Sequence, residues 1–235
     1  GTEAPEDPPV RVHVGGVDSW RDLPDWPPPG YRATTWHLQP AGGFAIGRPP
    51  ATPPDRFRYD PTRPTPTVGG AVENFDGTAG AKDNRKLEQR PDVLTYTSDA
   101  LTGDLEVIGP VTATIAIRST RDHTDLCVRL CDVHPNGRSV NLCDGARRLR
   151  PGQPAADPDG TRTVDIDLSG IAHMFRTGHR LRLHVAGGAH PRLTRNTGTG
   201  EPLATATHLE PADQEIFHDP RHPSGLTLPS AAPPR

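Results

Sequence analysis

Apolar and polar residues alternate with a period of two along the stretch from Asp92 to Arg150. Turn residues interrupt this alternation at Gly103, at Gly109-Pro110 and at Pro135-Asn136-Gly137. Such alternation is typical of β-strands that bury one face, because successive side chains of a strand point to opposite sides. The stretch therefore predicts several antiparallel strands, and we expect it to form the core of the fold.

The expected strands are short, and turn residues separate them at intervals of about ten residues. In the central stretch they fall at residues 93–97, 105–108, 111–117, 125–133 and 139–143, followed by a basic strand end at 147–150. Outside it they fall at residues 10–17, 31–38, 163–168, 180–185, 207–218 and 226–228, and residues 169–177 could hold one helical turn. Asn136-Gly137 predicts a tight hairpin turn, because both residues tolerate positive φ.

Two segments ahead of the core lack this pattern. Residues 18–30 carry Trp20 and Trp26 among several prolines, and we expect them to pack on a sheet or on a partner as docking anchors. Residues 39–91 are rich in Pro and Gly and almost without periodicity, which is typical of loops that are functional or wrap a neighbour. Within them, Phe57 and Tyr59 favour a short strand or an anchor.

The fold class follows from these elements. The 29 prolines disfavour long helices, and the strands do not alternate with helical patterns. We therefore expect an all-β fold, a jelly-roll β-sandwich with long Pro/Gly-rich loops. Its expected parts are a tail at 1–9, one domain at 10–229 (lead-in strands and wrapping loop at 10–91, core strands at 92–229) and a tail at 230–235.

Charge and hydropathy narrow the classes of partner. The formal net charge is −3, without the basic stripe of a nucleic-acid binder. The sequence holds neither an apolar run long enough to span a membrane nor a visible signal peptide. We expect no nucleic-acid or membrane partner and a cytoplasmic protein. Secretion stays open, because the opening GTEAPEDPP resembles the start of a cloned fragment.

The three cysteines predict buried free thiols. Cys127 and Cys131 would lie about 13 Å apart on one face of a strand, which is too far for a disulfide. Cys143 on a paired strand could approach either one. The odd count and the absence of a CxxC pair disfavour both a disulfide scaffold and a zinc site.

Sequence motifs for catalysis are missing. The chain has no GxSxG, HExxH, P-loop or GxGxxG after a strand. Its seven serines do not lie in a nucleophile elbow, the strained strand-to-helix turn of α/β-hydrolases. We therefore predict no catalytic residue and no cofactor in this chain.

Metal binding has two weak candidates. His218, Asp219 and His222 are close in sequence, but Pro220 and Pro223 fix that segment as a loop without a predictable third ligand. A loop with Asp99, Thr102, Asp104 and Glu106 could bind Ca²⁺, as loops of some sugar-binding sandwiches do. Solvated or hydrogen-bonded loops explain both patterns better, and we expect no metal site.

Two polar groups have alternative interpretations. The carboxylates of Asp122, Asp125, Asp132 and Asp144 suggest paired acids, but strand-end aspartates that bind backbone N–H groups explain them better. Residues Arg192, Arg195 and Asn196 could hold an anion or an interface carboxylate, and a structural clamp on loop carbonyls is the simpler alternative.

An ordered set of segments resembles a known family. It consists of DVLTYTS, LEVIGPVTATI, TDLCVRLCDVHPNGRSVNLCDGARRLR, FRTGHRLRLHVAGGAHPRLTRNTGTG and HPSGLTLP. Together with the lead-in VRVHVGGVDSWRDLPDWPPPG, it resembles the C-terminal domain of X-Pro dipeptidyl-peptidases, in the cocaine esterase and α-amino acid ester hydrolase (CocE/NonD) branch. The resemblance covers about residues 10–229. It implies a jelly-roll domain, galactose-binding-domain-like, of a serine hydrolase.

The family implies where the chemistry lies. Its members combine an α/β-hydrolase domain, a helical cap and a jelly-roll domain, and only the last resembles this chain. The resemblance therefore implies a non-catalytic accessory domain whose partner is an α/β-hydrolase catalytic domain, in the same polypeptide or in trans, in an enzyme that could be a homodimer. One departure is the sequence AGGAHP at 186–191, where relatives usually have Ser-Ser-Ser-Asn-Phe-Pro.

The same resemblance suggests a contribution to a substrate pocket. In relatives the loop after a Gly-Gly pair approaches the catalytic pocket, and here Glu73, Asn74 and Phe75 occupy that loop. We expect Phe75 to line the pocket; the alternative is an aromatic ring packed on its own sandwich. A carbohydrate-binding module without a hydrolase is the other functional class, but 3 Trp, 3 Tyr and 5 Phe supply few aromatics for a sugar platform.

Overall fold

A computed structural model describes residues 7–73 and 77–231. A two-stranded sheet, β1 with β2, precedes one sheet of eleven strands. In chain order the elements are β1 (Val10–Val14), β2 (Ser19–Leu23), β3 (Arg32–Gln39), η1 (Pro40–Gly42), β4 (Gly43–Ala45), β5 (Asp55–Tyr59), α1 (Arg85–Glu88), β6 (Val93–Thr97), β7 (Leu105–Ser119), β8 (Thr124–Val133), β9 (Ser139–Leu149), β10 (Arg162–Phe175), β11 (Arg180–Ala186), β12 (Ala212–Phe217) and β13 (Gly225–Ser230).

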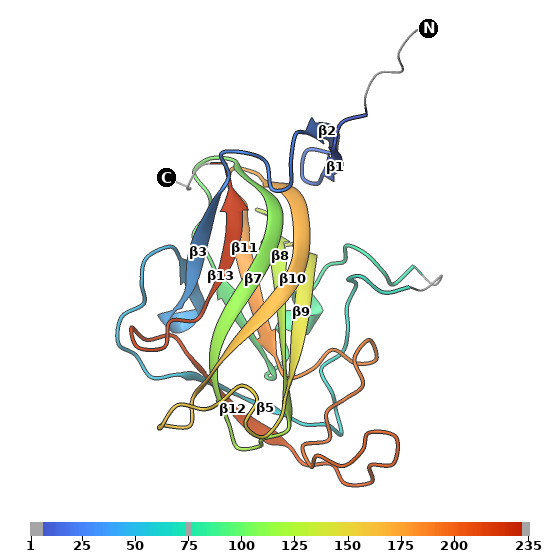
Figure 1. The fold of residues 1–235 in the computed structure, drawn as a ribbon, viewed down its shortest axis with the longest axis vertical. Helices are drawn as coiled ribbons and strands as arrows, with labels where there is room; N and C mark the ends of the chain where they lie inside the picture. The colour runs from blue at the N-terminus through green and yellow to red at the C-terminus, as the bar shows by residue number, and fades with distance from the viewer. Residues whose placement is uncertain (1–6, 74–76, 232–235) are drawn as a thin grey trace, which may run out of the picture.

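The large sheet folds over into two layers. Strands β3, β13, β7 and β10 form one layer, and β6, β11, β8 and β9 form the other (Figure 1). Strand β4 joins the layers, because it pairs with β3 on one side and with β6 on the other. Strands β12 and β5 extend the sheet at one end of β7. The structure confirms the expected all-β sandwich of the jelly-roll type.

Apolar residues from alternate strand positions fill the space between the layers. Leu126, Val128 and Leu130 of β8 belong to this core, as do Ile115 and Ile117 of β7. Their alternation is the pattern that predicted the strands, because every second side chain of a strand faces the same layer. Strand β8 is unusual, since all but one of its residues are buried and so both of its faces are covered.

Two predictions near the Gly109-Pro110 pair are wrong. The expected break there is absent, and β7 runs through it as one strand of 15 residues. The helical turn expected at 169–177 is also absent, because β10 continues to Phe175 through a register shift between Asp167 and Gly170. This irregularity lies opposite Pro110, and an irregular partner strand tolerates a proline that cannot donate a ladder hydrogen bond.

Most other strand predictions hold with shifted ends. Strand β6 occupies the predicted residues, and the hairpin turn before Arg138 places Gly137 at a φ of 83° with its N–H bonded to the His134 carbonyl at 2.8 Å. Strand β9 extends to Leu149 and absorbs the predicted basic strand end. The strand expected from residue 207 begins only at Ala212.

The segment with the two tryptophans is partly a strand. Residues 19–23 form β2, which the sequence did not predict, and β2 pairs with β1 in a hairpin beyond the end of the sandwich (Figure 1). The Trp26 ring packs against the backbone of β10, where a Cβ on Gly170 would lie 2.7 Å from it. The Trp20 side chain remains 69% exposed. In the described residues, no helix is long and apolar enough to cross a membrane.

Strands β9 and β10 approach each other closely at Gly145, where a side chain would not fit. A Cβ there would overlap the Asp167 carbonyl oxygen and lie 2.8 Å from a methyl carbon of Ile166. We expect Gly145→Ala to lower the free energy of unfolding by about 1–3 kcal/mol, because the strands must separate. Urea unfolding measures this. Gly103→Ala is the control, since nothing lies within 4 Å of its added Cβ; equal effects of the two substitutions would contradict the close approach.

Candidate functional site

The outer face of the layer β6–β11–β8–β9 carries buried polar residues. Alternation places Arg129 and Cys131 of β8, and His184 of β11, opposite to the apolar core positions. These side chains would face solvent in a bare two-layer sandwich. Instead, the chain between β5 and β6, which we call the wrapping segment (residues 60–92), covers them.

Arg129 is the centre of this buried layer. Its side chain is 8% exposed and donates to Asp144 Oδ2 from Nε at 3.2 Å and from Nη2 at 2.7 Å. Nη1 donates to Asn84 Oδ1 at 2.8 Å and to the Val68 carbonyl oxygen. Arg129 therefore joins a core strand to two points of the wrapping segment.

Asp144 balances the charge of two arginines. Arg192 donates to its Oδ1 while Arg129 occupies its Oδ2. Burial alone would raise the pKa of Asp144, but the bonds and charges of Arg192 and Arg129 outweigh it and hold the pKa below the ordinary value. The carboxylate therefore stays ionised and keeps both guanidinium groups in place.

The same layer closes the base of the Gly-Gly loop, which we define as residues 70–80. Gly70 and Gly80 exchange backbone hydrogen bonds of 2.8 and 2.9 Å. Asn141 of β9 donates to the Gly80 carbonyl at 3.1 Å and accepts from the Lys82 N–H at 2.8 Å. Gly69 has a φ of +62°, and a Cβ there would overlap the Gly80 carbonyl, so the base requires a glycine pair.

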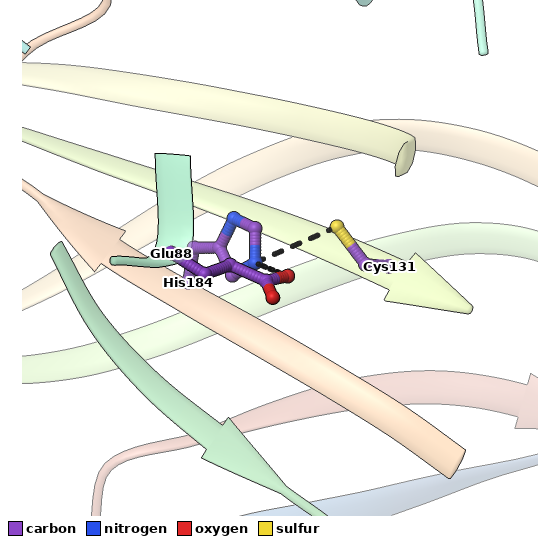
Figure 2. A group of neighbouring side chains, drawn as sticks. All are labelled: Glu88, Cys131 and His184. Carbon is purple, nitrogen blue, oxygen red and sulfur yellow. Dashed lines mark hydrogen bonds and ion pairs between the residues drawn. The ribbon is translucent and has the colours of Figure 1, made fainter. Parts of the chain in front are cut away.

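A second cluster lies under the helix of the wrapping segment. Figure 2 shows Glu88 of α1, Cys131 of β8 and His184 of β11 pointing toward one another. His184 Nε2 lies 2.9 Å from Glu88 Oε1 and 3.7 Å from Cys131 Sγ. Burial lowers the pKa of His184, but the facing Cys131 and Glu88 outweigh burial and raise the pKa to about 9.

A third cluster gathers histidines around Asp132. Its Oδ2 lies 3.0 Å from His173 Nε2, and its Oδ1 lies 2.8 Å from His179 Nδ1. Burial raises the pKa of Asp132, and the two histidines reverse that effect, so the pKa lies below its ordinary value. The His134 ring stacks on His179 with centroids 4.5 Å apart.

One groove connects the hairpin β1–β2 with the Gly-Gly loop. The groove has a volume of about 750 Å³. Gly15 and Gly16 line it at the turn of the hairpin, and Gly70 and Gly80 line it at the base of the loop. The Asp132 cluster lines the groove between these two ends. Two features that the sequence singled out separately thus border one continuous surface.

Of the three residues predicted to contribute to a substrate pocket, the structure describes only Glu73. Glu73 is exposed on the Gly-Gly loop, whereas Asn74 and Phe75 lie outside the described residues. The closed base of the loop is the part that the structure describes. The pocket contribution of all three residues stays a prediction.

The predicted anion contacts bind groups of the chain itself. Arg192 binds Asp144, and Arg195 Nη1 donates to the Pro61 carbonyl at 3.3 Å. Asn196 Nδ2 donates to Asp125 Oδ1 at 2.8 Å. Only Arg195 makes the contact expected of a clamp on loop carbonyls, since Arg192 and Asn196 bind carboxylates of the chain. An anion or interface role stays a prediction.

The turn-aspartate interpretation is wrong for the aspartates of β8 and β9. Asp125 binds the guanidinium of Arg148 at 2.7 and 2.8 Å, Asp144 binds two arginines, and Asp132 binds two histidines. Asp122 pairs with Arg162 at 2.5 Å. Asp125 and Asp132 bind arginine and histidine side chains because β8 is covered on both faces and its buried charges must be paired.

The two histidines of the first loop considered for a metal have different partners. His218 binds Asp55 at 3.0 Å, while His222 approaches Asp219 at 3.4 Å and groups with Asp157 and Asp159. In the loop considered for calcium, Asp104 binds Thr177 and Glu106 pairs with Arg21. The cysteines are free thiols, as predicted, and burial raises the pKa of Cys127 and Cys143 well above the ordinary range.

Sequence reasoning missed Arg129, Asn84, Asn141 and Glu88. The available signal was a charged residue inside a strongly apolar strand, where it must find a buried partner. The partners lie 45 residues away for Asn84 and 61 for Val68, in a segment without periodicity.

Arg129→Met tests the buried layer. After the change, Asp144 keeps only Arg192 as an arginine partner. The Val68 carbonyl and Asn84 Oδ1 of the wrapping segment lose the donor that Arg129 supplied. We expect a loss of about 3–5 kcal/mol in the free energy of unfolding, measured by urea denaturation. The control is Arg58→Met, which breaks the exposed pair with Asp213 and should cost less than about 1 kcal/mol. Equal costs for the two variants would contradict the central place of Arg129.

Comparisons with known proteins agree with this architecture. A family model described as the X-Pro dipeptidyl-peptidase C-terminal non-catalytic domain matches residues 3–227. Cocaine esterase of Rhodococcus sp. (strain MB1 Bresler) is 34% identical over 238 residues, which cover 94% of this chain and 42% of that protein.

Solved structures share the fold. The structure of an α-amino acid ester hydrolase has a TM-score of 0.86 at 25% identity and covers 95% of this chain and 41% of that one. An aminopeptidase from a marine sediment archaeon, Thaumarchaeota archaeon, has a TM-score of 0.85 at 23% identity, covering 95% and 40% respectively. The chain therefore spans less than half the length of the relatives it matches.

Proposed function

The chain belongs to the family of X-Pro dipeptidyl-peptidase C-terminal non-catalytic domains, and we propose that it is the accessory domain of a serine hydrolase that cleaves ester or peptide bonds. In this proposal the chain docks on an α/β-hydrolase catalytic domain and helps to shape its substrate pocket. The catalytic serine, histidine and aspartate belong to that partner. The share of each relative that this chain covers leaves room for such a domain.

The groove is the observation that carries the proposal. It joins the turn of the hairpin β1–β2 to the base of the Gly-Gly loop, so one partner surface can contact both. An isolated two-stranded hairpin is marginally stable in water, and this hairpin exposes Trp20 at its surface. A large aromatic side chain of this kind is a common anchor of protein interfaces.

The polar layer explains how the chain would act on a distant pocket. Arg129, Asn84 and Asn141 fix the ends of the Gly-Gly loop by directional hydrogen bonds. The tip of the loop, with Phe75, would then reach the catalytic domain from a fixed base. The alternative of a sugar-binding module gains no support. Of the two exposed tryptophans in the described residues, Trp20 belongs to the hairpin β1–β2, and the Trp26 ring is occupied by its packing against β10.

Phe75→Ala in the full-length hydrolase tests the pocket contribution. We expect kcat/KM for p-nitrophenyl esters or X-Pro amides to fall about 10-fold, because an aromatic wall of the pocket is lost. Leu203→Ala, which truncates another exposed loop residue, should leave kcat/KM unchanged. The same kcat/KM for Phe75→Ala and the parent would contradict the pocket contribution.

Trp20→Ala tests the docking anchor. In the full-length protein we expect a loss of about 2–4 kcal/mol of docking energy, seen as faster limited proteolysis between the domains and a lower Tm. In the isolated chain the change should leave the Tm unaltered, because the side chain is 69% exposed. If the full-length Trp20→Ala variant has the same Tm and the same rate of proteolysis as the parent, the hairpin is not the docking element.

A further inference from the structure

Three metal-binding side chains meet at one point under the wrapping segment. One ligand atom from each of Glu88, Cys131 and His184 lies within 4.8 Å of the other two. The residues come from α1, β8 and β11, and all three point inward to the same place (Figure 2). Their side chains are almost entirely buried, with Glu88 at 8% and His184 at 4% exposed.

Hydrogen bonding alone accounts poorly for this arrangement. His184 Nε2 carries at most one hydrogen, yet it faces both Glu88 Oε1 and Cys131 Sγ. If that hydrogen points to Glu88, the Cys131 thiol has no acceptor on the imidazole, and the described residues give it no other partner. Three electron-pair donors that converge on one point are the usual surroundings of a cation.

The spacing fits a tetrahedral zinc ion. Zinc binds sulfur at about 2.3 Å and nitrogen or oxygen at about 2.0–2.2 Å. At the tetrahedral angle, these bonds place N and O about 3.4 Å apart and N and S about 3.6 Å apart. The observed N···O and N···S separations are 2.9 and 3.7 Å, and the Glu88 oxygen lies within 4.8 Å of Cys131 Sγ. Side-chain movements that bring these atoms to the zinc-binding separations would complete three of the four positions.

From this geometry we infer that Glu88 Oε1, Cys131 Sγ and His184 Nε2 form a structural site for Zn²⁺. The mixed oxygen, sulfur and nitrogen donors suit a borderline-soft cation such as zinc and would bind Ca²⁺ or Mg²⁺ poorly. Binding releases the thiol proton of Cys131 and the Nε2 proton of His184 to solvent, so the ion meets a thiolate, a carboxylate and a neutral imidazole. The inference does not depend on the proposed hydrolase function.

The surroundings supply further support for the ion. Arg182 Nη1 donates to Glu88 Oε2 at 2.5 Å, which orients the other carboxylate oxygen toward the site. His184 Nδ1 is buried and has no hydrogen-bond partner among the described residues. His184 also lines a cavity of about 180 Å³, which Cys131 and Glu88 do not line. Water in this cavity would accept the Nδ1–H bond that zinc-bound histidines make.

Cobalt substitution tests the site in the purified 235-residue chain. We expect one Co²⁺ per chain, with a thiolate-to-cobalt charge-transfer band in the near ultraviolet, and zinc should displace the cobalt. Cys131→Ser should abolish the band, and Glu88→Gln should weaken binding at least 10-fold. The double variant Cys127→Ser/Cys143→Ser is the matched control, because it retains only Cys131 and should keep the full band.

Thermal unfolding provides a second readout that does not need a chromophore. Zinc at about 100 times its Kd should raise the Tm of the parent and of the control by about 5–10 °C, and should leave Cys131→Ser unchanged. A charge-transfer band that persists in Cys131→Ser, or the absence of a band in the parent, would overturn the assignment. A cooperative thermal transition of Cys131→Ser would show that this variant is folded. A missing band could then not be explained by unfolding.

Discussion

The buried guanidinium of Arg129 is the constraint on which this structure depends. A charge that is 8% exposed cannot stay without partners, because the cost of a buried unpaired ion exceeds what a single strand can tolerate. Its partners come from β9 and from two separate points of the wrapping segment. The residue therefore dictates where Val68 and Asn84 of the wrapping segment must lie. The packing of the sandwich fixes only where β8, and with it Arg129, lies.

The wrapping segment depends on side chains for its order. Its prolines cannot donate hydrogen bonds, so it cannot join the sheet as continuous strands. Backbone hydrogen bonds attach the segment at two short bridges, Pro66 with His190 and Asp83 with Val140. Polar side chains add to them: Thr65 donates to Asp92 at 2.7 Å, and Thr67 donates to the Ala189 carbonyl at 2.7 Å. The apolar contribution is small, with Leu87 and Val93 in a minor cluster. The segment is thus held by directional bonds more than by packing.

Much of the fold was predictable from period-two alternation, because that pattern is local. Strand β6 and the hairpin around Gly137 were placed correctly for this reason. The continuous β7 and β10 were not predicted, since the irregularity of β10 opposite Pro110 is a property of the pair of strands. The polar layer was missed for a similar reason. The partners of Arg129 lie in a segment that has no pattern of its own, so only the folded chain brings them together.

This type of anchoring suits a domain whose proposed work is to position a loop. Apolar packing tolerates small sliding movements, whereas a guanidinium with partners on several of its nitrogens fixes both distance and direction. Arg129 of β8 binds the Val68 carbonyl just before the Gly-Gly loop, and Asn141 of β9 binds the Gly80 carbonyl at its end. Both ends of the loop are thereby tied to adjacent strands. A loop that is fixed at both ends by charged and amide groups can hold a pocket wall to the tolerance that catalysis requires, where displacements of about 1 Å reduce rates about 100-fold. Under the proposed function, the residues that satisfy a buried charge would also hold the wall of a distant active site.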